Sequence, residues 1–73
     1  MIKESSQIIH MQIRLVVLAT KKWHIPLKKV NILFQKYNVY HYIAKHFEIF
    51  HMEGDLAVLE DVKSYMSANG FSA

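Results

Sequence analysis

Polar and apolar positions along the chain recur with the period of an α-helix, and they predict four helices, over about residues 6–23, 26–36, 39–51 and 56–68. Glycine and proline fall at the ends of these segments. Pro26 suits the first turn of the second helix, where its missing N–H is not needed, and Gly54 ends the third. Asn69 and Gly70 are typical of a left-handed cap on the fourth. The sequence therefore predicts an all-α fold, a compact four-helix domain that covers residues 1–73.

Short polar side chains mark two further helix ends. Ser5 or Ser6 is expected to cap the first helix, because a serine side chain can accept hydrogen bonds from the open N–H groups of a first turn. Asn38 is expected to end the second helix and to cap the third.

The first predicted helix is apolar around nearly all of its circumference. Only His10, Arg14 and Lys21 cluster as a polar stripe, and a surface helix normally carries a single apolar stripe that faces the core. Three short partner helices cannot cover the rest of the first helix, so we expect one of its faces to contact another chain in a homodimer. Its apolar positions are Ile8, Ile9, Met11, Ile13, Leu15, Val16, Val17, Leu18, Ala19 and Trp23.

Gln12 lies inside this apolar surface. A buried amide without a hydrogen-bond partner costs on the order of 1–3 kcal/mol, so Gln12 needs one. The partner is either the same residue of a second copy or a nearby backbone carbonyl, and the sequence does not decide between them. Ile32 is apolar on the polar side of the second helix, which indicates a further contact. The candidate interface residues are Ile9, Gln12, Ile13, Val16, Val17 and Ile32.

Aromatic residues are concentrated between Ile32 and His51, and most of them fall on the inward faces of the second and third helices. Each aromatic side chain buries about 150–250 Å², so a few of them compensate for a short chain. The predicted inward residues are Leu27, Val30, Leu33, Phe34, Tyr37, Val39, Ile43, Phe47 and Phe50, followed in the last helix by Leu56, Val58, Leu59, Val62, Tyr65 and Met66. An alternative makes Leu56–Leu59 a short extended segment, with Asp61 capping a helix from Val62.

Length and composition narrow the class of protein. A domain of 73 residues buries only roughly 60% of the surface that its unfolded chain exposes, so its core is small even though 52% of the residues are hydrophobic. The chain has no cysteine, which excludes disulfides and thiolate metal sites and is compatible with a reducing compartment. The longest apolar run, Leu15–Ala19, is much shorter than the ~20 residues of a membrane span, and the N-terminus lacks the order of a signal peptide. We expect a soluble cytoplasmic protein with no membrane contact.

The chain is mildly basic, with a net charge of +3 and an isoelectric point near 9.3. Four lysines form a local basic patch around the predicted break at Pro26: Lys21, Lys22, Lys28 and Lys29. Such a patch could attract an acidic partner or phosphates, and it is also an ordinary composition for a solvated connection between helices.

Catalytic and metal-binding patterns are missing from the sequence. His41, His46 and His51 are five residues apart, whereas two ligands on one helix face need a spacing of four. His46 falls on the apolar side of its helix, where a histidine with one hydrogen-bond partner is expected. Glu60 and Asp61 are adjacent and point in different directions, and no phosphate loop or catalytic triad is present. We expect no catalytic residue, no metal, no cofactor and no enzymatic activity.

Two classes of binding function remain. The predicted function is a protein-interaction module, because the first helix is too apolar for one subunit to cover. The alternative is a DNA-binding regulator, in which the helices joined near Asn38 form a helix-turn-helix and Tyr40, His41 and Lys45 contact the duplex. That outward face has few of the basic and amide side chains that read bases and phosphates, so nucleic acid is the less favoured partner.

The segment "LFQKYNVYHYIAKHFEIFHMEG" resembles a family of short bacterial proteins that share a domain of unknown function. The similarity covers about residues 8–66, with glycine usual in the family in place of Asn38 and a serine-like cap in place of Pro26. Members are often encoded near ADP-ribosyltransferase-like proteins, so the resemblance implies a small partner or antidote of such an effector. The matching positions are Leu33, Phe34, Lys36, Tyr37, Val39, Tyr42, Ile43, His51, Gly54, Glu60, Asp61 and Tyr65.

Overall fold

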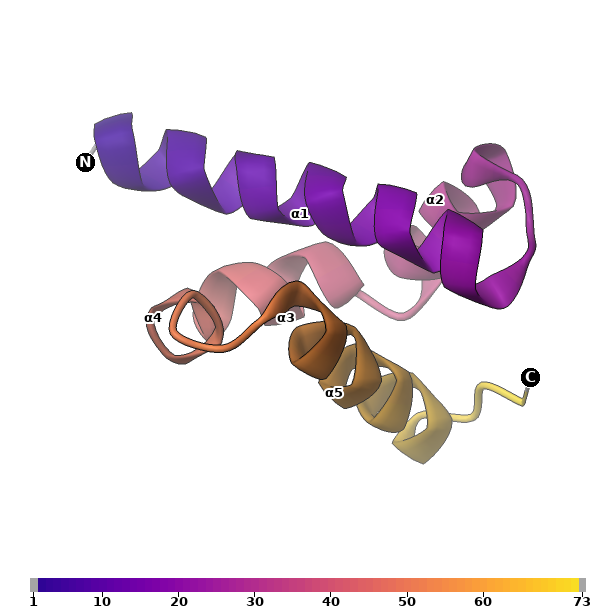
Figure 1. Cartoon of the computed structure of the whole chain (residues 1–73). Helices are drawn as coiled ribbons and strands as arrows, with labels where there is room; N and C mark the ends of the chain where they lie inside the picture. The colour runs from indigo at the N-terminus through magenta and orange to yellow at the C-terminus, as the bar shows by residue number, and fades with distance from the viewer. Residues whose placement is uncertain (1, 73) are drawn as a thin grey trace.

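The computed structural model describes residues 2–72, with side chains from Ser6 onward. Within these residues the secondary structure is entirely helical, which confirms the all-α fold. The longest helix, α1, lies along one side of the molecule, with α3, α4 and α5 below it and α2 beside its C-terminal part (Figure 1). The helices are α1 (Ile2–Trp23), α2 (Leu27–Lys36), α3 (Val39–Lys45), α4 (Phe47–Phe50) and α5 (Asp55–Ala68).

Two helix starts differ from the sequence prediction. α1 begins at Ile2, about one turn earlier than expected, so Ser5 and Ser6 lie inside the helix rather than at its cap. α2 begins at Leu27, and Pro26 precedes it in an extended conformation. The Pro26 carbonyl accepts backbone hydrogen bonds from Lys29 and Val30, so the proline is the N-cap residue just before the first turn and not part of that turn.

The helix predicted over residues 39–51 is interrupted at His46, which corrects the prediction of one continuous helix. His46 has φ −107° and ψ 18°, outside the helical region, and it separates α3 from the single turn of α4. Its carbonyl still accepts hydrogen bonds from Ile49 and Phe50. His46 therefore keeps its own backbone hydrogen bonds at the break, and Phe47 and Phe50 beyond it are both buried.

Asn38 ends α2 by its backbone conformation and not by a side-chain cap. Its φ of 59° and ψ of 34° place it in the left-handed region, and its side chain makes no capping hydrogen bond to α3. Asparagine enters this region more easily than most residues. The predicted helix boundary at Asn38 is correct, whereas the predicted side-chain cap is wrong.

The last segment is helical throughout, so the extended alternative for Leu56–Leu59 is wrong. At its other end Gly70 has φ +106°, its N–H donates to the carbonyl of Ser67, and the N–H of Phe71 donates to the carbonyl of Met66. This pair of hydrogen bonds forms a Schellman cap, as the Asn69-Gly70 pair predicted.

The core forms where α1 lies over α2, α3 and α5. Its ten largest fully buried side chains come from α1, α2, α3 and α5, and the two phenylalanines of α4 complete it. Rings at its margin pack against one another: Tyr42 stacks on Tyr65 with centroids 3.9 Å apart, joining α3 to α5. The buried residues are Met11, Leu15, Val16, Ala19, Val30, Phe34, Val39, Ile43, Phe47, Phe50, Val58, Leu59, Val62 and Met66.

Candidate interaction surface

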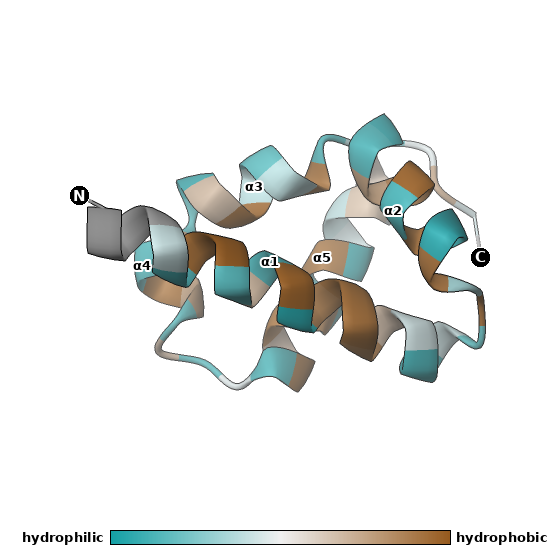
Figure 2. Cartoon of the chain, turned by 90° about the horizontal axis from the view of Figure 1, so that it is seen from above, coloured by the Kyte–Doolittle hydropathy of each residue, from teal (hydrophilic) through white to brown (hydrophobic). Residues whose placement is uncertain are grey.

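The side of α1 that faces away from the core carries exposed apolar side chains. Ile9, Ile13 and Val17 follow one another at intervals of four residues and remain 52%, 55% and 39% exposed. Leu27, at the start of α2, and Leu56, at the start of α5, flank this row and are 53% and 56% exposed. Apolar segments run along α1 in the view from above (Figure 2). These five residues are called the α1 face below.

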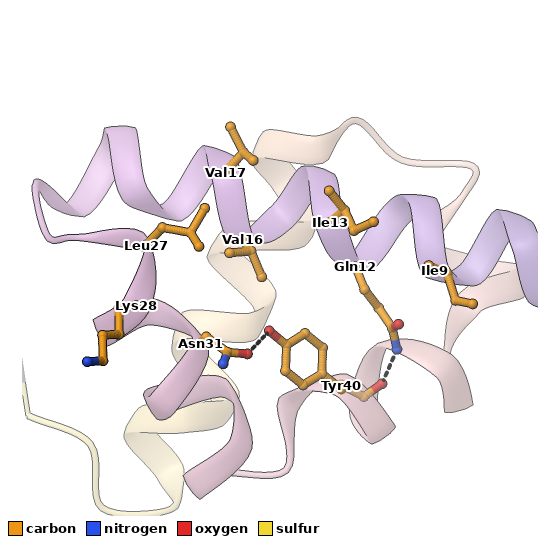
Figure 3. A pocket seen from close by; sticks show the side chains of 9 residues that line it. All are labelled: Ile9, Gln12, Ile13, Val16, Val17, Leu27, Lys28, Asn31 and Tyr40. Atoms are coloured by element: carbon orange, nitrogen blue, oxygen red, sulfur yellow. Dashed lines mark hydrogen bonds between the residues drawn. The ribbon is translucent and has the colours of Figure 1, made fainter.

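A groove of about 470 Å³ lies along one edge of the α1 face, between α1, α2 and α3. Ile9 and Lys28 lie at its opposite ends, and Tyr40 lies between them (Figure 3). Its lining is mostly apolar, which is typical of a surface that binds another molecule. The lining residues are Ile9, Gln12, Ile13, Val16, Val17, Leu27, Lys28, Asn31 and Tyr40.

Tyr40 organises the polar groups of this groove. Its hydroxyl donates a hydrogen bond of 2.7 Å to Asn31 Oδ1, and its backbone carbonyl accepts one of 2.8 Å from Gln12 Nε2 (Figure 3). Its ring packs edge-on against Phe34, with centroids 5.5 Å apart, and burial raises the pKa of its hydroxyl. Gln12 is thus satisfied by a backbone carbonyl, so the amide needs no second copy of itself.

A second hollow of about 390 Å³ lies on the other edge of the α1 face, between α1 and α5. Ile13 and Val17 line both hollows and so form the ridge between them. Arg14 Nε donates to Asp55 Oδ2 at 3.0 Å across this hollow. The two depressions and the ridge make one apolar surface, which a partner could contact on both sides of α1.

Only some of the predicted interface residues lie exposed on the α1 face. Ile9, Ile13 and Val17 are on it and exposed, whereas Val16 is only 7% exposed and belongs mainly to the core. Ile32 is 53% exposed but lines neither hollow. The structure thus brings together three of the predicted apolar contacts and separates Ile32 from them.

The three residues that the DNA-binding alternative predicts as contacts differ in how exposed they are. His41 and Lys45 are exposed on α3. Tyr40, in contrast, is half-buried, with its hydroxyl hydrogen-bonded to Asn31 and its ring against Phe34. The prediction of Tyr40 as a DNA contact conflicts with these bonds, because the side chain would have to leave them to reach a duplex.

The four lysines of the predicted basic patch lie around the connection between α1 and α2, and they do not form a single patch. Lys28 lines the groove and Lys21 lines the second hollow. Lys22 and Lys29 line a third hollow of about 420 Å³ near Trp23, where Lys63 of α5 joins them. Positive charge therefore borders the α1 face at its α2 end.

Two of the five histidines, His46 and His51, pack against aromatic rings. The ring of His46 lies edge-on to Tyr42 at 4.8 Å and tilted to Phe50 at 5.7 Å, and His51 stacks on Phe47 at 5.2 Å. Among the residues that the structure describes, no three His, Asp or Glu side chains come together as metal ligands.

None of the described helices is long and apolar enough to cross a membrane.

Two features of the structure were missed by the sequence analysis, one on the α1 face and one between α3 and α5. Leu27 and Leu56 were placed on inward faces, but each lies at the first turn of its helix, where the side chain extends past the core and becomes exposed. The Tyr42 hydroxyl donates to Asp61 Oδ1 at 2.8 Å, a link between α3 and α5 that no local pattern indicates. Burial and the Asp61 carboxylate raise the pKa of Tyr42 to about 12.

One comparison with known proteins gives a match. A family model described as "Protein of unknown function (DUF3791)" matches residues 10–69. No curated protein and no solved structure matches the chain.

Proposed function

The chain belongs to the DUF3791 family of proteins of unknown function, and we propose that it acts as a non-enzymatic protein-interaction module. The observation that carries the proposal is the α1 face, on which Ile9, Ile13 and Val17 form an exposed apolar row beside a groove of about 470 Å³. Exposed apolar surface of this kind, bordered by polar residues, marks protein interaction sites.

The spacing of the row suits a helical partner. Grooves that bind an amphipathic helix contact it through apolar side chains spaced three or four residues apart. Val17 lies eight positions after Ile9, which is roughly 12 Å along the helix axis and matches about two turns of a partner helix. Ile13, between the two hollows, would occupy the centre of such a contact.

The resemblance noted from the sequence gives the partner a candidate identity. Short bacterial proteins of this pattern are often encoded near ADP-ribosyltransferase-like proteins, and we propose that such a neighbouring effector is the bound protein. The chain would then act as its partner or antidote in the cytoplasm, a location with which the absence of cysteine is compatible. Binding another protein requires no catalytic residues.

Self-association is the competing use of the same face. A homodimer through α1 remains a prediction, since a second copy could also cover Ile9, Ile13 and Val17. Sedimentation velocity at high micromolar concentration measures it directly. A species of twice the chain mass that Val17→Glu converts to monomer would show that a second copy covers this face.

The proposed function is tested by capturing the partner from the native host with three forms of the protein. Val17→Glu places a charge on the exposed ridge, and Ile49→Glu places the same charge on α4, on a side chain that is 61% exposed and lines neither hollow. We expect the wild type and Ile49→Glu to retain one specific protein that Val17→Glu loses. Circular dichroism checks that both variants remain helical. Equal capture by Val17→Glu would show that the α1 face is not the binding surface.

A further inference from the structure

Acidic and basic residues occupy different parts of this chain. Between Ser5 and Phe47 the sequence contains no aspartate or glutamate, and from Glu48 to Asp61 it contains every acidic residue except Glu4. Most of α1 and all of α2 and α3 fall within the first of these segments. Its charged residues are all basic, namely Arg14, Lys21, Lys22, Lys28, Lys29, Lys36 and Lys45.

This separation determines the charge around the α1 face. Lys28 lines the groove at its α2 end, and Lys21 lines the second hollow beside Val17. The one carboxylate that lines either hollow is Asp55, and it forms an ion pair with Arg14 at 3.0 Å. The apolar surface is therefore bordered by positive charge that the side chains lining it do not neutralise.

We propose that the occupant of the α1 face is an amphipathic helix of another protein whose polar side is acidic. The proposal rests on the proposed function and names the chemistry of its partner. Apolar side chains of that helix contact Ile9, Ile13 and Val17, and its carboxylates lie near Lys21 and Lys28. Complementary charge across an interface speeds association and rejects wrong partners.

The same charges disfavour a second copy as the occupant. A symmetric dimer buries the same patch of both chains, so each copy contributes its own Lys21 and Lys28 to one interface. A second copy therefore adds positive charge to the interface, whereas an acidic helix supplies the opposite charge. Of the acidic side chains that the structure describes, only Asp55 lines the surface, and it is already paired with Arg14.

Two synthetic peptides test the proposal. Both carry the same leucine anchors at helical spacing over about 15 residues, with glutamate at the remaining positions of one and lysine at those of the other. Fluorescence anisotropy measures the binding of each labelled peptide to the full-length protein. We expect the acidic peptide to bind at least tenfold more tightly at about 0.01 M salt. The preference should shrink toward 0.15 M, where the Debye length falls from about 30 Å to about 8 Å.

Substitutions test which side chains cause the preference for the acidic peptide. Lys28→Glu should reduce the preference for the acidic peptide several-fold. Lys63→Glu makes the same change in net charge beside Trp23, away from the groove, and should leave most of the preference intact. Ile13→Glu should abolish binding of both peptides, because it removes the central apolar contact.

Each other result overturns the proposal. Equal affinity for the two peptides would show that charge does not select the occupant, and the apolar docking of the proposed function would survive. Binding of neither peptide would exclude an amphipathic helix as the ligand, and the capture experiment with Val17→Glu would then judge the proposed function by itself. Self-association that Ile13→Glu abolishes would identify a second copy as the occupant.

Discussion

At the scale of single residues, two backbone positions have unusual conformations. His24 and Asn38 are the non-glycine residues with positive φ in the described chain, at 57° and 59°. The left-handed region costs an ordinary residue about 1–2 kcal/mol, and asparagine less than histidine. His24→Gly should therefore raise the free energy of unfolding by about 1 kcal/mol, as measured by chemical denaturation. A loss of stability would show that the His24 side chain contributes more than its backbone costs.

His41 provides the control for this substitution. It is exposed like His24 but lies within α3, so glycine there has no left-handed conformation to relieve. His41→Gly should lower stability by about 1 kcal/mol, the usual cost of glycine inside a helix. Opposite signs for two His→Gly changes would separate backbone strain from loss of the imidazole.

Tyr42 gives the protein a defined response to alkaline pH. Burial, together with the hydrogen bond to Asp61, raises its pKa from 10.0 to about 12 in the folded chain. Above pH 10 the unfolded chain loses the hydroxyl proton while the folded chain retains it, so the unfolded state binds fewer protons and stability falls as pH rises. The contribution is complete below pH 10 and is lost as pH approaches 12. Unfolding curves measured across this range should show the decline.

Tyr42→Phe separates this effect from the general loss of lysine charge at high pH. The variant keeps the ring that stacks on Tyr65 but has no proton to lose. It should be less stable at neutral pH by about 1 kcal/mol, for the lost hydrogen bond, and should show a flatter decline above pH 10. Parallel curves for the two proteins would contradict the assigned role of the hydroxyl.

At the scale of helices, a glycine stands just beyond each end of α5, and only Gly70, at the C-terminal end, has a positive φ. A Cβ added at Gly70 or Gly54 would meet no atom within 4 Å, so sterics do not distinguish the two positions. Gly70 has φ +106° in the Schellman cap, whereas Gly54 has φ −78°, which any residue can adopt. Gly70→Ala should cost about 1 kcal/mol or more, and Gly54→Ala less than about 0.5 kcal/mol. Thermal unfolding of the pair measures the difference, and equal losses would contradict it.

Helix ends could be predicted where a residue with a special backbone marks them. Pro26 and Gly70 placed the start of α2 and the end of α5, because their conformational preferences hold in any surroundings. The break at His46 carries no such residue, and apolar positions continue through it to Phe50. It brings Phe47 and Phe50 into the core through contacts with other helices, which a local pattern does not contain.

The candidate site could be predicted in part for the same reason. Periodicity predicted Ile9, Ile13 and Val17 as interface positions, and all three side chains are exposed. It could not distinguish Val17 from Val16, because adjacent residues differ by only about 100° around the axis and the packing of α2 and α3 decides which is covered. The partner of Gln12, a carbonyl 28 residues away, likewise depends on tertiary structure.

At the scale of the whole molecule, the chain is compact by itself. Its radius of gyration is 11.6 Å, close to the roughly 11 Å expected for a folded domain of this length. The exposed row on α1 is thus not the result of an open or incomplete fold. A folded subunit with one apolar side is the arrangement that a docking function requires.

The C-terminal ends of α1, α2 and α5 meet at an aromatic contact. Phe71, just past α5, packs against Trp23 at the end of α1, at 6.3 Å, and edge-on against Tyr37 at the end of α2, at 5.7 Å. Since Phe71 is half-buried, Phe71→Ala should cost about 2 kcal/mol, less than the 3–5 kcal/mol of a fully buried ring, and lower Tm by roughly 10 °C. Trp23 is the single tryptophan, so its fluorescence should shift to the red as water reaches it. Phe71→Leu, which keeps an apolar side chain there, should lose about half as much stability. An unchanged Tm and emission in Phe71→Ala would show that α1, α2 and α5 are held together without this contact.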